Sequence, residues 1–215
     1  AQGALDRNSP AYGQIDEGID LVAGELKRLS DAGVTVLWRP LHEASGHDGK
    51  GWFWWGRART DGAPQAYAYI LLWRHMYDRL VNLHGLHNLI WVWNAQDPAW
   101  YPGDDVVDVT SYDIYDQTDN KRYRSQLQTY RLAQQASAES KPIALSETGY
   151  IPDPDQLEAD GAHWLWFMVW NDGGSPAGVS DPNNFWTGEY YNTAAHKRKV
   201  YQHPKVITLD RLPTF

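Results

Sequence analysis

Five short apolar runs constrain the fold of this 215-residue chain more than any other feature. They lie at residues 34–41, 88–94, 106–112, 142–146 and 164–170. Each run is mostly apolar, which is typical of strands in a parallel sheet that is covered on both faces. Apolar spacing and turn residues predict an N-terminal loop over residues 1–14 and then helices at residues 15–32, 64–83, 123–138 and 191–202. The sequence therefore predicts an α/β fold.

Polar side chains follow these runs, at Glu43, Asn94, Asp113, Glu147 and Asn171. Polar groups at successive strand ends are typical of the active face of a (β/α)8 TIM barrel. A doubly wound sheet would usually carry a Gly-rich phosphate turn, and the sequence has none. A complete barrel has eight strands in about 250 residues. We therefore predict that residues 1–215 form a single catalytic barrel domain that carries only the fourth to eighth β/α units and lacks its N-terminal third.

Two of the strand-end residues are glutamates, Glu43 after WRPLH and Glu147 after PIALS. Cleavage of a glycosidic bond needs two carboxyl groups, one to protonate the leaving oxygen and one to attack the sugar or activate water. A lone glutamate is usually a solvated surface charge. Two of them directly after apolar strands in the same barrel predict a catalytic pair.

The aromatic composition favours a sugar ligand. The chain has 12 Trp and 13 Tyr against 4 Phe, so most of its rings carry a polar atom. Trp52, in the run GWFWWG, and Trp170, at the end of the last strand, are the best candidates for surfaces that stack on sugar rings. The tryptophans that we expect to pack in the barrel or at its rim are Trp38, Trp54, Trp55 and Trp91.

Other polar residues near the strand ends are candidates for binding substrate. Tyr115 could donate a hydrogen bond that stabilises an ionised nucleophile, although packing on the barrel rim is a competing interpretation. His42 could hold Glu43 or bind a sugar hydroxyl, or could be a rim histidine with its hydrogen bonds satisfied. Asp113 and Asn94 complete the candidate set.

Charge and composition exclude several classes of protein. A net charge of −8 argues against nucleic acid as a partner. The absence of cysteine excludes disulfides, thiolate metal sites and a cysteine nucleophile. No apolar run approaches the roughly 20 residues of a membrane span, and the N-terminus has no signal-peptide pattern. We expect neither a metal nor another cofactor.

Several longer motifs resemble glycoside hydrolase family 26, whose members are chiefly endo-β-1,4-mannanases. They are WRPLHEASG, WFWWG, NLIWVWN, YPGDDVVDVTSYDIY and ALSETG, in that order, within about residues 21–171. The resemblance implies a retaining clan A barrel with Glu43 as acid/base and Glu147 as nucleophile. It places His42, Trp52, Asp113, Tyr115 and Trp170 around the scissile bond. The chain departs from the family in three respects. It has extra residues between Gly46 and Trp52, it has Ser45 where the family often has Asn, and nothing in it matches the Trp-His pair of the family's early strands.

The resemblance implies endo-cleavage of β-1,4-mannosidic bonds in mannan, glucomannan or galactomannan by double displacement, with carboxyls about 5–5.5 Å apart. It implies a secreted monomer whose partner is the polysaccharide, with or without accessory carbohydrate-binding or cellulosomal modules. Three alternatives stay open: a β-1,3-xylanase or mixed-linkage β-glucanase that uses the same glutamates, a non-catalytic carbohydrate-binding fragment, and a fragment that is inactive alone.

Overall fold

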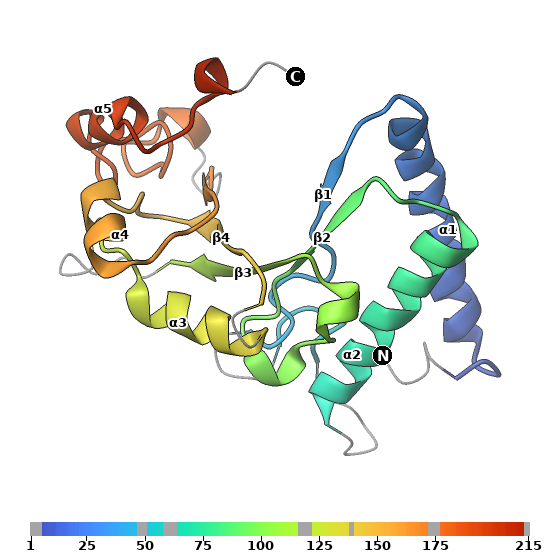
Figure 1. Cartoon of the computed structure of the whole chain (residues 1–215). Coiled ribbons are helices and arrows are strands. Elements are labelled where there is room, and N and C mark those ends of the chain that lie inside the picture. Colours follow the sequence, from blue (N-terminus) through green and yellow to red (C-terminus); the bar gives the residue numbers. More distant parts are fainter. Residues whose placement is uncertain are drawn as a thin grey trace. The chain divides into compact units, whose positions relative to one another are not determined.

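The computed structural model describes residues 6–46, 51–57, 64–115, 122–137, 140–171 and 177–212. The chain forms two compact units, Ala1–Ser111 with Ala133–Pro142, and Tyr112–Leu132 with Ile143–Phe215. Its strands follow one another across the sheet in sequence order: β1 (Val36–Trp38), β2 (Leu89–Trp93), β3 (Val109–Ile114), β4 (Ile143–Thr148) and β5 (Phe167–Val169) (Figure 1). The pairs β1–β2, β2–β3 and β4–β5 are parallel, which confirms the predicted parallel sheet.

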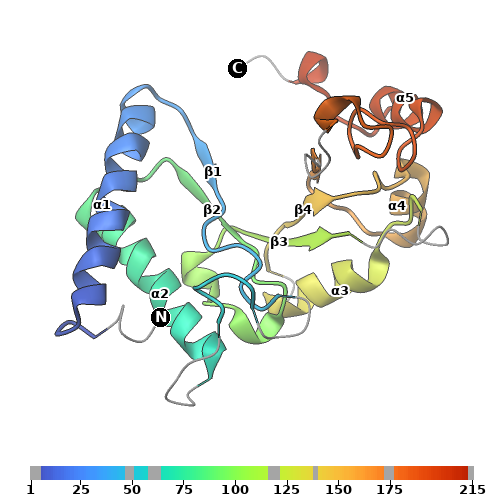
Figure 2. The same ribbon diagram turned by 180° about the vertical axis from the view of Figure 1, so that it is seen from behind.

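In the first unit, two helices lie next to β1 and β2 in both views (Figures 1 and 2). Helix α1 (Pro10–Asp31) buries Ile19, Ala23 and Leu26, and helix α2 (Gln65–Tyr77) continues into a π-helical turn, η1 (Asp78–Leu83). The prediction of loop over residues 1–14 was wrong from Pro10 onward. Ser9 caps the helix by accepting a hydrogen bond from the Ala11 N–H, and Pro10 occupies the first turn, where its missing N–H costs nothing.

Two carboxylates of α1 fasten this helix to α2 and η1. Arg79 donates to Asp16 at 2.9 Å and to both carboxylate oxygens of Asp20, at 2.7 and 2.6 Å. His75 contacts Asp16 and His84 contacts Asp20, each at 2.6 Å. The hydrogen bond from Arg79 is the main cause that lowers the pKa of Asp20 from 3.8 to about 2. Because the folded-state pKa is the lower one, this stabilisation is present above pH 3.8 and is lost as the pH falls towards 2.

Replacing Arg79 with alanine should lower the free energy of unfolding by about 2 kcal/mol, because it leaves two partly buried carboxylates without their cation. Urea denaturation at neutral pH measures this change. Lys27→Ala is the matched control, since it breaks a pair with Asp31 whose side chains are 57% and 62% exposed. That control should cost less than about 0.5 kcal/mol. Equal losses in the two variants would show that Asp16 and Asp20 gain nothing from Arg79.

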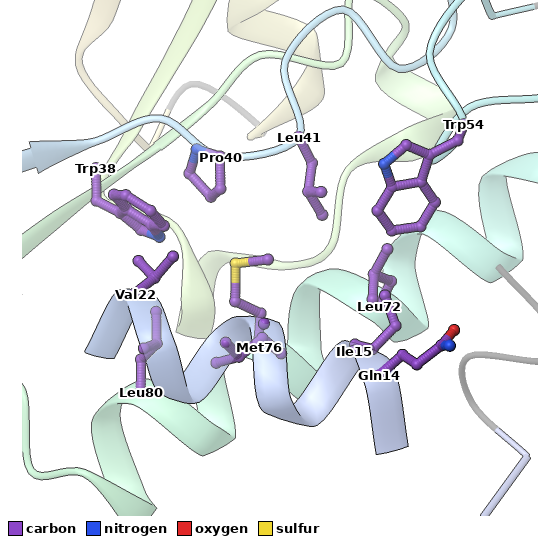
Figure 3. Close-up of a pocket in the computed structure, with 12 residues that line it drawn as sticks. Gln14, Ile15, Val22, Trp38, Pro40, Leu41, Trp54, Leu72, Met76 and Leu80 are labelled. Atoms are coloured by element: carbon purple, nitrogen blue, oxygen red, sulfur yellow. The ribbon is translucent and has the colours of Figure 1, made fainter. Parts of the chain in front are cut away.

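An apolar pocket of about 450 Å³ opens between α1, α2 and the segment that follows β1 (Figure 3). Trp38 and Trp54 border it, and Met76 lies between them. The Trp38 indole nitrogen is buried and has no hydrogen-bond partner among the described residues. Residues 34–41 were predicted to be a buried strand, but β1 is three residues long and Leu37 is 56% exposed. The reason is that β1 is an edge strand, which among the described strands pairs with β2 alone.

The second unit contains helices α4 (Pro154–Asp160) and α5 (Ala194–Gln202) (Figure 2). Lys199 of α5 pairs with Asp153 and Asp155, which joins the two helices. The sequence analysis missed α4, which has an Asp153 cap and Pro154 in its first turn. Helix α3 (Leu127–Ala136) begins four residues later than predicted.

Strand β3 begins three residues later than predicted, because Asp104–Val106 is a 3-10 turn. Its ladder with β2 starts at Val109. The residue before it, Asp108, uses its carboxylate to accept the Trp91 N–H at 2.8 Å. Short 3-10 helices also occur at Pro98–Trp100, Gly178–Ser180 and Leu209–Arg211. Within the described residues, no helix is both long and apolar enough to cross a membrane.

Candidate active site

Glu43 lies in a turn that the end of β2 holds in place. Its backbone N–H donates to the Asn94 carbonyl oxygen at 2.6 Å and to Asn94 Oδ1 at 3.2 Å. The Ser45 N–H donates to the Ala95 carbonyl at 3.0 Å. Leu41 and Glu43 have φ of 53° and 49°, a left-handed conformation that costs residues with a side chain about 1–2 kcal/mol each. The turn therefore depends on these bonds to keep the half-buried Glu43 in position.

Asn94 is the centre of this arrangement. Its side chain is fully buried. Oδ1 also accepts a hydrogen bond from Arg39 at 3.3 Å, and Nδ2 donates to Ser111 Oγ at 3.2 Å. Contact of Asn94 with substrate stays a prediction. The bonds of its buried side chain to protein groups show that it supports the Glu43 turn, and Arg39 is a polar neighbour that the sequence analysis did not single out.

The tryptophan run docks on the same turn. A Cβ on Gly56 would lie 1.7 Å from the Ala44 carbonyl oxygen, and one on Gly51 would lie 2.7 Å from it. The two glycines therefore let the backbone of residues 51–57 approach the turn closely, which no other residue type would permit. This places the Trp52 indole N–H 3.2 Å from Glu43 Oε2. Residues 47–50, which hold most of the extra length noted in the sequence, lie outside the described residues.

The other aromatic side chains of the run take different roles. Phe53 and Trp55 stack at 4.5 Å, and the half-buried His42 ring lies 4.8 Å from Phe53. The Trp55 indole N–H donates to the His42 carbonyl at 2.9 Å. Trp54, which we predicted to pack, is instead 49% exposed at the edge of the apolar pocket. Trp91, by contrast, is buried as predicted, at 3% exposure.

In the second unit, Glu147 lies within β4, and only 5% of its surface is exposed. The Tyr115 hydroxyl donates to Glu147 Oε2 at 2.7 Å. A hydrogen bond of this kind favours the ionised carboxylate that a nucleophile requires. Sequence reasoning raised this bond as one of two interpretations of Tyr115, and the structure contains it.

Asp113 lies in β3 and Trp170 lies just after β5, the two strands that flank β4. Asp113, in β3, is 5% exposed and accepts a hydrogen bond from Ser146 Oγ at 2.7 Å. Trp170 follows β5, and its N–H donates to the Thr148 carbonyl at 3.1 Å. Trp170 is 44% exposed, and its stacking on a sugar stays a prediction.

His196 ties α5 to the chain just beyond β4. Its Nε2 lies 2.8 Å from the Ile151 carbonyl oxygen, so this nitrogen carries the proton, and the Tyr123 ring stacks on the imidazole at 3.4 Å. Burial lowers the pKa of His196 below its ordinary 6.5, despite the opposing effect of the Ile151 carbonyl. The unfolded chain thus binds the proton more readily than the folded one. The contribution of His196 to stability is therefore full above about pH 6.5 and falls as the pH drops below it.

A His196→Gln variant keeps an N–H donor for Ile151 but has no imidazole to titrate. Its stability should therefore lack the pH dependence that His196 contributes. We expect the variant to be less stable than the original chain at pH 7.5 and the difference in unfolding free energy to shrink at pH 5.5. Denaturant unfolding at both pH values measures the difference, with the exposed His163→Gln as control. A constant difference would contradict the neutral, buried state of His196.

Comparison with known proteins assigns the family. The model of glycosyl hydrolase family 26 matches residues 1–211. The chain belongs to this family. A mannan endo-1,4-beta-mannosidase of Thermothelomyces thermophilus is 45% identical over 201 residues, which are 94% of this chain and 36% of that protein.

Two solved family 26 structures share the fold. A GH26-CBM35 β-(1,4)-mannanase of Podospora anserina matches 98% of this chain and 42% of its own, with 38% identity and a TM-score of 0.79. A β-mannanase from a symbiotic protist of the termite Reticulitermes speratus, complexed with gluco-manno-oligosaccharide, matches 100% of this chain and 59% of its own, with 34% identity and a TM-score of 0.81. The predicted (β/α)8 class is thereby confirmed, and the chain spans about a third to three fifths of these relatives.

Proposed function

We propose that this family 26 chain carries the reactive glutamates of a retaining endo-β-1,4-mannanase. Glu147 attacks the anomeric carbon while protonated Glu43 delivers its proton to the departing oxygen. Glu43 then deprotonates the water that hydrolyses the glycosyl-enzyme. The observation that carries the proposal is that each glutamate has its own aromatic hydrogen-bond donor: Trp52 for Glu43 and Tyr115 for Glu147. The relatives named as mannanases, one of them with gluco-manno-oligosaccharide bound, support mannan as the substrate.

Three substrates and one stereochemical measurement test this function. The protein is incubated with β-mannan, mixed-linkage β-glucan and β-1,3-xylan, and new reducing ends are counted. We expect release from mannan, with the β-anomer seen first by proton NMR. Release of reducing ends only from glucan or xylan would reassign the substrate. A first-formed α-anomer would exclude retention. Binding to mannan without cleavage would indicate a carbohydrate-binding fragment.

We also propose that these 215 residues supply the fourth to eighth β/α units of the barrel and that residues outside this chain supply the first three. The exposed Leu37 of edge strand β1, the apolar pocket and the unpaired indole N–H of Trp38 support this division. An apolar dye such as 8-anilinonaphthalene-1-sulfonate should bind the 215-residue chain and should lose binding when the first three units are co-expressed with it. Dye binding that is unchanged would contradict the proposal.

The enzyme, we propose further, acts as a secreted monomer, because its substrate is a polymer outside the cell. Detection of the protein in culture medium and sedimentation of the purified enzyme test the two points separately. Sedimentation as a dimer would exclude the monomer, and retention inside the cell would exclude secretion.

A further inference from the structure

A buried amide joins the chain beyond the nucleophile to a loop near the C-terminus. Asn192 is fully buried, and its side chain makes three hydrogen bonds. Oδ1 accepts the Ile151 N–H at 2.8 Å, and Nδ2 donates to the carbonyl oxygens of Gly149 at 2.6 Å and Phe185 at 2.9 Å. Gly149 lies two residues after Glu147. The amide therefore fixes the backbone directly after the proposed nucleophile.

The loop that Asn192 closes, residues 181–192, is itself rigidly built. Asn184 is 1% exposed, and its Oδ1 accepts the N–H groups of Trp186 and Thr187 at 3.0 and 2.9 Å. Its Nδ2 donates to Asn171 Oδ1 at 2.9 Å. A Cβ on Gly188 would lie 2.2 Å from the Pro182 carbonyl oxygen. We refer to residues 181–192 as the bracing loop.

Phe185 is the side chain of the bracing loop that lies against Gly149 and near Tyr115. It is 4% exposed, and a Cβ on Gly149 would lie only 2.8 Å from its Cε1 atom. Its ring centroid lies 5.9 Å from that of Tyr115, whose hydroxyl donates to Glu147. One loop therefore contacts both the backbone that follows Glu147 and the phenol that binds its carboxylate.

We propose that Phe185 and Asn192 are positioning residues for the nucleophile, which act through Tyr115 and Gly149 without touching substrate. This inference rests on the proposed role of Glu147. A displacement of about 1 Å at a reacting group costs about 100-fold in rate. Because neither residue touches substrate in this proposal, we expect the loss to fall on kcat.

The test uses Phe185→Leu and Asn192→Ala in the mannan-hydrolysing enzyme. We expect kcat to fall about 10-fold in the first and about 100-fold in the second, with KM changed by less than about threefold. Ser125→Ala is the matched control, since it removes the hydrogen bond from the buried Ser125 to Asp160 elsewhere in the same unit and should leave kcat and KM unchanged.

A double-mutant cycle separates positioning from general destabilisation. If Phe185 acts through Tyr115, then Phe185→Leu in a Tyr115→Phe background should lower kcat little further. Additive losses of kcat in the double variant, or a wild-type kcat in Phe185→Leu, would overturn the proposal. If Asn192→Ala does not fold, the result for Phe185→Leu decides. Failure of the underlying function is recognised separately, because Glu147→Ala would then retain turnover.

Discussion

Replacement of Glu147 by alanine is expected to lower the kcat for mannan by roughly 10⁴-fold or more, since the variant lacks the carboxylate that is proposed to attack the sugar. The loss should appear in kcat at nearly constant KM, because a carboxylate that forms a bond only in the transition state adds little to ground-state binding. The reducing-end assay on the purified variant measures it. The fold should survive, because alanine keeps the backbone of β4 and removes a side chain that accepts the Tyr115 hydroxyl.

The matched control for this experiment is Glu158→Ala in α4. Its side chain is 51% exposed and pairs with Lys205 on the surface. The control should retain full turnover. Turnover in Glu147→Ala that matches the control would remove Glu147 as the nucleophile. Loss of activity in both variants would point to damage of the second unit and would remove the support for a specific role.

The second large effect is expected for Glu43→Gln, which keeps the shape of the side chain and removes the acidic proton. Hydrolysis of mannan should fall by roughly 10² to 10⁴-fold, the usual contribution of general acid–base catalysis. With a dinitrophenyl β-mannobioside, the rate of the first step, formation of the glycosyl-enzyme, should fall much less, because dinitrophenolate leaves without a proton. Stopped-flow release of dinitrophenol should therefore show a burst followed by slow turnover.

Azide provides the decisive control for Glu43. As a nucleophile that needs no general base, azide should restore steady-state turnover of the dinitrophenyl substrate in Glu43→Gln and yield β-mannobiosyl azide. It should have no such effect on Glu25→Gln, an exposed residue of α1 that pairs with Arg28. Equal losses on mannan and on the activated substrate, without azide rescue, would mean that Glu43 does not act as acid/base.

Much of the fold could be predicted because its signals are local. Mostly apolar runs marked all five strands, and apolar spacing marked α1, α2 and α5. The errors also have local causes. The signal Ser9-Pro10 for the start of α1 was present and overlooked, and the Asp153 cap with Pro154 marked the short helix α4 in the same way. The burial of β1 could not be predicted, because burial depends on which strands lie beside it.

The sequence by itself determined the family, the parallel strand order, and the two glutamates that the strands carry, because these features depend on residue type and on position along the chain. Only the tertiary structure decided which donor each carboxylate receives, that Asn94 supports a turn, and that Asn192 fixes the chain beyond Glu147. Those contacts join residues up to 51 positions apart. Hydrogen bonds over such separations arise from packing, which no local pattern of residues encodes.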